Sequence, residues 1–256
     1  MLAYDRYGQG KSSPDPADEG KEPGRGHDVT DAVHDLHQLV QQIAKERVEL
    51  PATSKEDVHL ILICNSIGCA IARLYTQRYP GTVTGMVFLD PNMANSDFVS
   101  MFPNPDAIDF NAKALAEGLT ADDLRRARDV YAEHFHPSVS NPEGLNRETL
   151  RELLPRPEEP KLEGPGGKGP YLTIVGHDWD TFAEHCAAGR LKILEALTMA
   201  YVNPCWQQYN EGLIHTTDKD RSQGPLIAKG CGHFIHKDDP EFVVKKVCEM
   251  LEKLGF

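Results

Sequence analysis

The chain has 256 residues, a length typical of one domain that buries its core without covalent cross-links. Its net charge of −12 argues against binding to nucleic acids or anionic membranes, both of which require a basic face. Six scattered cysteines indicate free thiols in a reducing compartment, and without an apolar leader or long apolar run we expect a soluble cytoplasmic protein.

Continuous apolar segments alternate with amphipathic ones along most of the chain. Five short segments are typical of strands covered on both faces: Leu2–Tyr4, Val58–Cys64, Val83–Leu89, Tyr171–Val175 and Leu226–Ala228. Helical patterns occupy Asp28–Ile43, Ile67–Tyr79 and Asp239–Leu254. This alternation predicts an α/β fold with a mostly parallel sheet in a three-layer arrangement.

The first turn and the first helix carry two patterns that resemble ligand sites. The sequence GQGKSS resembles a Walker loop, but Asp5 stands where that loop needs its first glycine, and prolines follow. His27, His34 and His37 flank the first helix without the spacing of an H-E-x-x-H zinc site, which favours a solvated polar face. We therefore expect no cofactor and no metal.

Ser66 follows the second apolar segment directly and precedes an amphipathic helix. A serine hydroxyl in a sharp strand-to-helix turn is exposed to a substrate, and the next backbone N–H, that of Ile67, points at the reacting carbonyl. Such a turn requires small neighbours, and here Cys64 and Gly68 flank the serine at two residues on either side. The alternative is an ordinary turn in which Ser66 caps the helix.

Residues 92–159 interrupt the alternation with polar, helical sequence, in which Ala121–Phe135 is the clearest helix. A Pro/Gly-rich stretch then returns the chain to the sheet. We predict a helical cap and return linker at 92–159, inserted into a core made of residues 1–91 and 160–256. Aromatic residues of this segment either line a substrate pocket or, for most of them, pack its helices together.

His233 follows the last apolar segment in the sequence GCGHFIHKDDP. A glycine-rich turn there holds an imidazole over the end of a sheet, where it can take the proton of Ser66 and return it later. His236 is the competing histidine, but it lacks the adjacent glycines.

Three motifs in this order resemble the α/β-hydrolase fold superfamily along the whole chain. Tyr4–Ser12 resembles its D-x-x-G-x-G-x-S turn, CNSIGC resembles G-x-S-x-G, and the His233 segment resembles its C-terminal G-x-G-H motif. Two further stretches, VGHDWDTFAE and NPCWQQYNEGL, look similar to uncharacterised fungal members. The strands that open this fold have no counterpart before Met1, so the resemblance implies an N-terminally incomplete core, with only Ile67 as an oxyanion-hole donor.

The resemblance implies a serine hydrolase that cleaves a small, apolar ester or lactone through an acyl-Ser66 intermediate, with His233 as base and acid. For the carboxylate that orients His233 we choose Asp178, after the strand that follows the cap. Asp180 and Asp90 remain open, although an Asp–Pro turn is the simpler interpretation of Asp90. The competing functions are a ligand-binding protein without turnover and an inactive truncated homologue. A homodimer that covers an exposed sheet edge is the expected protein partner.

Overall fold

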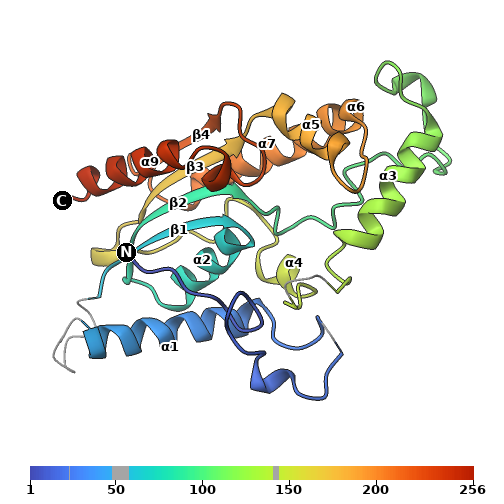
Figure 1. The fold of residues 1–256 in the computed structure, drawn as a ribbon. Helices are drawn as coiled ribbons and strands as arrows, with labels where there is room; N and C mark the ends of the chain where they lie inside the picture. The colour runs from blue at the N-terminus through green and yellow to red at the C-terminus, as the bar shows by residue number, and fades with distance from the viewer. Residues whose placement is uncertain (23, 48–57, 141–143) are drawn as a thin grey trace.

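A computed structural model describes residues 1–22, 24–47, 58–140 and 144–256 of the chain. Four parallel strands form one sheet in the order β1 (Leu60–Ser66), β2 (Val83–Pro91), β3 (Tyr171–His177) and β4 (Ser222–Ala228) (Figure 1). The longer helices are α1 (Val29–Arg47), α2 (Ile67–Arg78), α3 (Ala121–His134), α5 (Trp179–Ala188), α7 (Asn203–Leu213) and α9 (Pro240–Lys253). Shorter helical turns are η1 (Pro16–Asp18), η3 (Ala112–Ala114), α4 (Leu150–Leu153), η4 (Pro165–Gly167), α6 (Glu195–Leu197), η5 (Thr198–Val202), η6 (Ile214–Thr216) and α8 (Ile235–Asp238).

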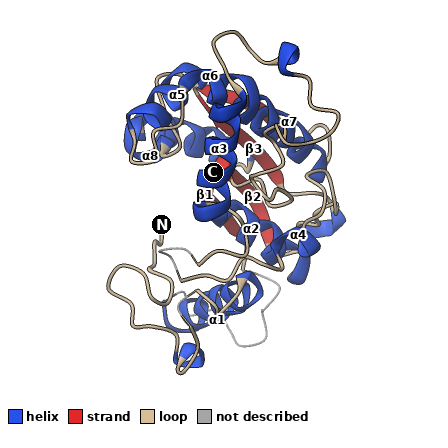
Figure 2. Ribbon diagram, turned by 90° about the vertical axis from the view of Figure 1, so that its right-hand side faces the viewer, coloured by secondary structure: helices blue, strands red, loops and turns tan. Residues whose placement is uncertain are grey.

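Helices cover both faces of the sheet, which gives the three-layer α/β arrangement. Apolar residues of α2 and α7 pack with one face of β2 and β3 in the larger buried core. The opposite face of the same strands packs against α8 and α9 in a smaller core. Helix α1 lies beyond α2, on the side away from the strands (Figures 1 and 2). Within the described residues, no helix is long and apolar enough to cross a membrane.

Strand β2 lies at the centre of this arrangement and is buried along almost its whole length. It pairs with β1 on one side and β3 on the other, so that Ser66 lies opposite Pro91. Because parallel strands end at the same edge of a sheet, the residues that follow β1, β2, β3 and β4 gather at one edge. This edge is the place where we expect the chemistry.

Four of the expected strands are confirmed as β1 to β4: Val58–Cys64, Val83–Leu89, Tyr171–Val175 and Leu226–Ala228. The first three end two residues later than expected, and β4 begins four residues earlier. The expected helices after β1 and at the C-terminus are α2 and α9, the helix at Asp28–Ile43 is α1, and that at Ala121–Phe135 is α3.

The expected strand at Leu2–Tyr4 is wrong. These residues lie in coil and are exposed, Leu2 by 56%. An isolated strand gains little without a neighbour to bond, and among the described residues the outer edge of β1 is without a strand partner. The turn after this segment nevertheless forms, because the Asp5 carboxylate accepts a hydrogen bond from the Lys11 N–H at 3.0 Å and Ser12 Oγ donates to the Asp5 carbonyl.

Residues 92–159 leave the sheet after β2 and contain η3, α3 and α4. Thr120 begins α3 with a capping box, in which its hydroxyl accepts from the Asp123 N–H and the Asp123 carboxylate accepts from the Thr120 N–H. Phe102 packs edge-on against Tyr131 of α3 with ring centroids 4.8 Å apart, and both rings are buried. These two aromatic residues thus hold the segment together.

The helical stretch from α5 to η6, between β3 and β4, is not predicted by the sequence pattern. It consists of short helices interrupted by a loop and by the π-helical turn η5, so an apolar stripe does not continue over many turns. Its buried residues, among them Phe182, Val202 and Trp206, join the larger core.

Candidate active site

Ser66 lies in a strained turn between β1 and α2. Its backbone angles are φ 54° and ψ −124°, a conformation that non-glycine residues adopt at a cost of about 1–3 kcal/mol. Although Ser66 occupies the N-cap position of α2, its side chain makes no capping hydrogen bond to a described residue. The turn therefore matches the predicted elbow, and an ordinary helix cap does not explain it.

The two small residues that flank the elbow lie against each other. A Cβ atom built on Gly68 would be 3.6 Å from the Cβ of Cys64, an ordinary van der Waals contact. Burial raises the pKa of the Cys64 thiol to about 12, so this cysteine stays protonated and is a poor nucleophile. Of Cys64 and Ser66, only Ser66 therefore offers a side chain that can act as a nucleophile at this turn.

The His233 loop follows β4 and is fastened directly to the elbow. The side-chain amide of Asn65 donates to the His233 carbonyl at 2.9 Å and to the Leu89 carbonyl at 2.8 Å. One residue thus connects the ends of β1 and β2 to the loop after β4. Gly232 precedes the histidine, and a Cβ atom there would lie 2.3 Å from the Nδ1 atom of the exposed His185 in α5, so a larger residue would displace that side chain.

Asp90 is the carboxylate that meets His233. The Nδ1 atom of His233 lies 2.6 Å from Asp90 Oδ2, and Asp90 is completely buried at the end of β2. An ionised carboxylate here fixes the proton on Nδ1 and leaves Nε2 as the acceptor. The His233 side chain is 23% exposed, so this nitrogen can meet a substrate or a hydroxyl.

Asp90 holds a second histidine with its other oxygen. His177, the last residue of β3, is 2% exposed, and its Nδ1 atom lies 2.8 Å from Asp90 Oδ1. The Nε2 atom of His177 lies 3.1 Å from the Oδ1 atom of the buried Asn203. Sequence reasoning missed both residues. The signal for His177 was only that a polar residue ends an otherwise apolar strand, and Asn203, the first residue of α7, gave none.

These contacts keep Asp90 ionised. Burial by itself raises the pKa of the Asp90 carboxyl, but the hydrogen bonds from His177 and His233 and the electrostatic interaction with these two rings outweigh it, so the pKa lies below its usual value. Like Ser66, Asp90 has a positive φ, 44°, in a non-glycine residue. Two strained residues thus end neighbouring strands at the same edge of the sheet.

Asp178, which the sequence places beside His233, lies elsewhere in the site. Its carboxylate accepts hydrogen bonds from the Thr181 N–H at the start of α5 and from the Gly230 N–H, and it pairs with Lys229 at 3.3 Å. Burial raises the pKa of this carboxyl, but these donors outweigh it and lower the pKa below its usual value. Asp178 thus fastens the His233 loop to α5, while Asp90 accepts the hydrogen bond from the imidazole.

Asp180 and His236, the competing acid and base, are both exposed. Asp180 lies in the first turn of α5, and His236 lies in α8, where its ring is 6.1 Å from that of Phe234. Neither residue therefore shares the buried environment of Asp90.

Ile67 is the first residue of α2, directly after Ser66. The first N–H groups of a helix have no acceptor within the helix. The Ile67 N–H is therefore placed as an oxyanion donor requires, next to the hydroxyl that would attack.

Aromatic side chains surround the histidines. The Trp206 ring lies 5.6 Å from that of His233 and 5.5 Å from that of His177, and its indole N–H donates to the Pro91 carbonyl at 2.8 Å. Phe182 stacks on His177 with centroids 4.1 Å apart. His233 and Asp90 therefore lie in an apolar environment that strengthens their hydrogen bond.

Comparison with known proteins gives one match along almost the whole chain. The sequence profile of the alpha/beta hydrolase family matches residues 1–246. No curated protein matches the chain.

Among solved structures, the chain is similar to a thermophilic esterase from Thermogutta terrifontis, with 15% identity and a TM-score of 0.49, over 98% of this chain and 78% of that chain. It is similar to MenH from S. aureus, with 13% identity and a TM-score of 0.45, over 96% and 80% of the two chains. A third similar structure comes from a study of carboxylesterases of Nitrososphaera gargenis, with 12% identity and a TM-score of 0.39, over 89% and 74%.

Proposed function

Since the chain belongs to the alpha/beta hydrolase family, a membership that supports hydrolase activity, we propose that it is a serine hydrolase acting on small, apolar carboxylic esters or lactones. The observation that carries the proposal is the arrangement around a strained, uncapped Ser66: the neighbouring Asn65 holds the loop of His233, and the His233 Nδ1 atom is bonded to a buried Asp90. We therefore assign the role of the orienting acid to Asp90 and no longer to Asp178.

In the first half of the reaction, the Ser66 hydroxyl attacks the ester carbonyl while His233 Nε2 takes its proton. The new bond joins Ser66 Oγ to the carbonyl carbon, and the carbonyl oxygen becomes an oxyanion to which the Ile67 N–H donates. Asp90 stabilises the imidazolium through Nδ1. When the oxyanion collapses, the alkoxide leaves with the proton from Nε2, and an acyl-Ser66 remains.

In the second half, a water molecule replaces the alcohol. His233 Nε2 takes a proton from the water as its oxygen attacks the acyl carbon, and then returns that proton to Ser66 Oγ as the acyl bond breaks. The carboxylic acid leaves, and Ser66 and His233 regain their starting protonation.

The apolar substrate class rests on the side chains around the histidines. Trp206 and Phe182 contact the imidazoles of His233 and His177 and contribute no charged group.

Labelling with a fluorophosphonate tests the proposal, because this probe reacts only with an activated serine. We expect one adduct on the wild-type chain by intact mass, none on Ser66→Ala, and a loss of p-nitrophenyl acetate turnover of about 10⁶-fold in that variant. Ser96→Ala, a serine in the loop after β2, is the matched control and should label like the wild type. Equal labelling of Ser66→Ala and wild type would refute the proposal; saturable ligand binding by an unlabelled, folded chain would favour a ligand-binding protein without turnover.

A further inference from the structure

The loop that leads into α1 is folded around one carboxylate, well apart in sequence from the residues of the active site. Asp18 accepts the His27 N–H with Oδ1, and its Oδ2 atom lies 2.6 Å from His27 Nδ1. A Cβ atom on Gly26 would be 1.8 Å from Asp18 Oδ1, so only glycine allows this approach. The loop thus positions the His27 imidazole from two sides.

The other nitrogen of this imidazole has no partner. His27 is 5% exposed, and its Nε2 atom is buried without a hydrogen-bond partner among the described residues. Since the Asp18 carboxylate holds the proton on Nδ1, Nε2 presents a lone pair. Leaving a buried acceptor unpaired destabilises a fold, so a group that binds this lone pair would stabilise the folded chain.

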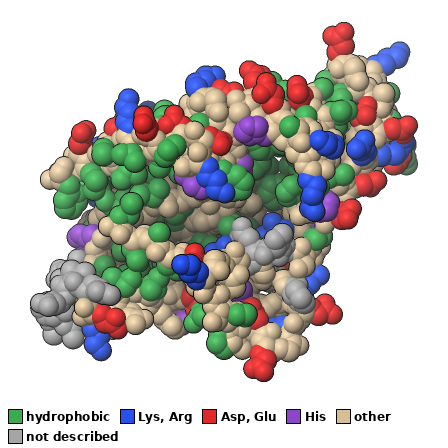
Figure 3. Space-filling model, in the orientation of Figure 1, with side chains coloured by type: hydrophobic (Ala, Val, Ile, Leu, Met, Phe, Trp, Pro, Cys, Tyr) green, Lys and Arg blue, Asp and Glu red, His purple; other side chains and the backbone are tan. Residues whose placement is uncertain are grey.

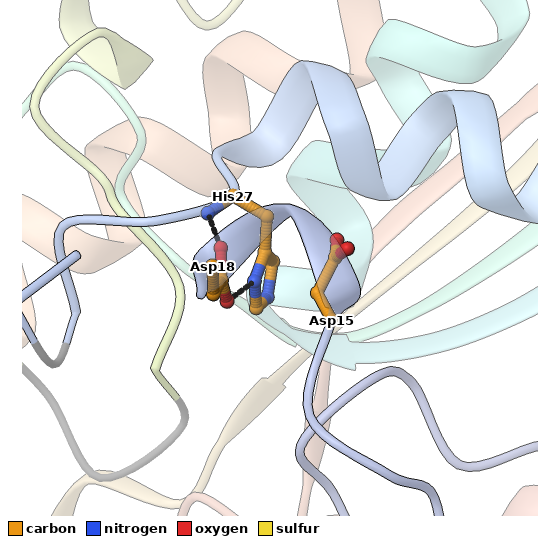
Figure 4. A group of neighbouring side chains, drawn as sticks. All are labelled: Asp15, Asp18 and His27. Atoms are coloured by element: carbon orange, nitrogen blue, oxygen red, sulfur yellow. Dashed lines mark hydrogen bonds and ion pairs between the residues drawn. The ribbon is translucent and has the colours of Figure 1, made fainter. Parts of the chain in front are cut away.

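A second carboxylate faces the same imidazole. Figure 4 shows the His27 ring between Asp18 on one side and Asp15 on the other. One donor atom from each of the three residues lies within 4.8 Å of the other two. Asp15 also caps η1, where it accepts the Ala17 N–H at 2.8 Å.

Further charged side chains surround the three residues: the carboxylates Asp5 and Asp35 and one arginine, Arg6. His27 and Asp35 both line a cavity of about 210 Å³ between the N-terminal turn and α1. Burial, followed by the charges of Asp15 and Asp31, raises the pKa of the Asp35 carboxyl. A cation bound here would relieve this repulsion.

We propose that Asp15 and His27, with Asp18 orienting the imidazole, bind one divalent transition-metal ion of the Zn²⁺ class. His27 Nε2 is the nitrogen ligand, Asp15 is an oxygen ligand, and Asp18 holds the imidazole in the tautomer that can bind, as carboxylates commonly do for metal-bound histidines. A mixed nitrogen and oxygen donor set suits Zn²⁺, whereas Mg²⁺ and Ca²⁺ prefer oxygen ligands throughout. The ion would fasten the loop to the start of α1 and stabilise the folded chain.

The expectation of a solvated face was correct for the exposed His34 and wrong for His27 and His37. His34 bonds to Gln38, and His37 stacks on Tyr79 with ring centroids 3.6 Å apart. Only His27 is turned toward carboxylates, and these belong to the loop before the helix rather than to its face. A search for ligands at helical spacing could not find them.

Calorimetric titration of the chelator-treated full chain with ZnCl₂ and with MgCl₂ tests the proposal, together with thermal unfolding in each ion. We expect one tight equivalent of Zn²⁺, a raised Tm, and neither effect from Mg²⁺. Asp15→Asn keeps the cap on η1, because asparagine is also a good N-cap, but removes the charge. It and Asp18→Asn should weaken Zn²⁺ binding by about 10–100-fold. Asp129→Asn, the same change at an exposed site on α3, should bind like the wild type.

Zn²⁺ binding that is unchanged in both Asp15→Asn and Asp18→Asn would overturn the proposal, as would binding weakened equally in Asp129→Asn. An equal rise in Tm with Mg²⁺ would overturn the class of ion. His27→Gln tests the nitrogen ligand, and if this buried variant fails to fold, the two aspartate variants still decide the outcome. Fluorophosphonate labelling of Ser66 should be the same with and without chelator.

Discussion

Asp90 has two histidine partners, and this determines which aspartate we expect to matter for turnover. Asp90→Asn should lower kcat by about 10⁴-fold, because an amide cannot hold the His233 tautomer or stabilise the imidazolium. Asp178→Asn should leave kcat within a few-fold, since asparagine can still cap α5. Steady-state hydrolysis of p-nitrophenyl acetate by the two folded variants compares them.

The pair of variants is a matched test, because each changes one buried or nearly buried carboxylate at the same edge of the sheet. If Asp178→Asn loses as much activity as Asp90→Asn, the acid role belongs to both residues or to Asp178. Circular dichroism of each variant separates a catalytic loss from unfolding.

The backbone of Ser66 provides a second test at this scale. Glycine adopts φ 54° and ψ −124° without steric strain, whereas alanine is strained in this conformation. We expect Ser66→Gly to have a free energy of unfolding about 1 kcal/mol above that of Ser66→Ala, although both lack activity. Urea unfolding measures the difference, and equal stabilities would show that the elbow is not strained.

At the scale of elements, the glycines of the two loops differ in what they permit. Gly232→Ala places a methyl group against His185 and should lower the free energy of unfolding by about 1–3 kcal/mol and reduce kcat, because His233 is the next residue. Gly68→Ala, within α2, meets only an ordinary contact and should be neutral or stabilising by up to about 1 kcal/mol.

Thermal unfolding and turnover of the two alanine variants give the comparison. A Gly232→Ala chain with wild-type stability would mean that the loop after β4 can move away from α5 without cost. A strongly destabilised Gly68→Ala chain would mean that the elbow needs a glycine for a reason other than the Cys64 contact.

The sequence predicted the elements well where they have strong patterns. Continuous apolar runs revealed β1 to β4, and the stripe of α1 and the small residues around Ser66 indicated a helix and a sharp turn. The acid was not predictable in the same way. The path of the loop after β4 decides whether His233 contacts Asp90, near the end of β2, or Asp178, directly after β3. Asn65 and contacts between segments distant in sequence set that path.

For the whole molecule, the outer edge of β1 is one of the two edges of the sheet. Among the described residues β1 pairs only with β2, and Ile63 near its end is 38% exposed. Figure 3 shows apolar side chains gathered over the left part of this face, and α9 contributes Val244, which is 61% exposed. An unpaired apolar edge is a template for another strand.

We therefore propose that two copies of the chain associate along β1. Sedimentation velocity should show a sedimentation coefficient that rises with concentration, and Ile63→Lys should weaken the association, because a charged edge opposes strand pairing. Val244→Lys makes the same change on α9 and should have the smaller effect. A single species at all concentrations, or equal effects of the two substitutions, would contradict the proposal.

The position of Asp90 also bears on how chains of this kind can diverge. In the proposed mechanism Asp90 is the acid, so the proposed nucleophile, its acid and the Asn65 amide that holds the His233 loop all lie on β1 and β2. The stretch from α5 to η6 is then free of residues that take part in proton transfer. Insertions and replacements there can remodel the walls around the substrate while the proton path stays intact, so selection on substrate range and selection on chemistry act on separate parts of the gene.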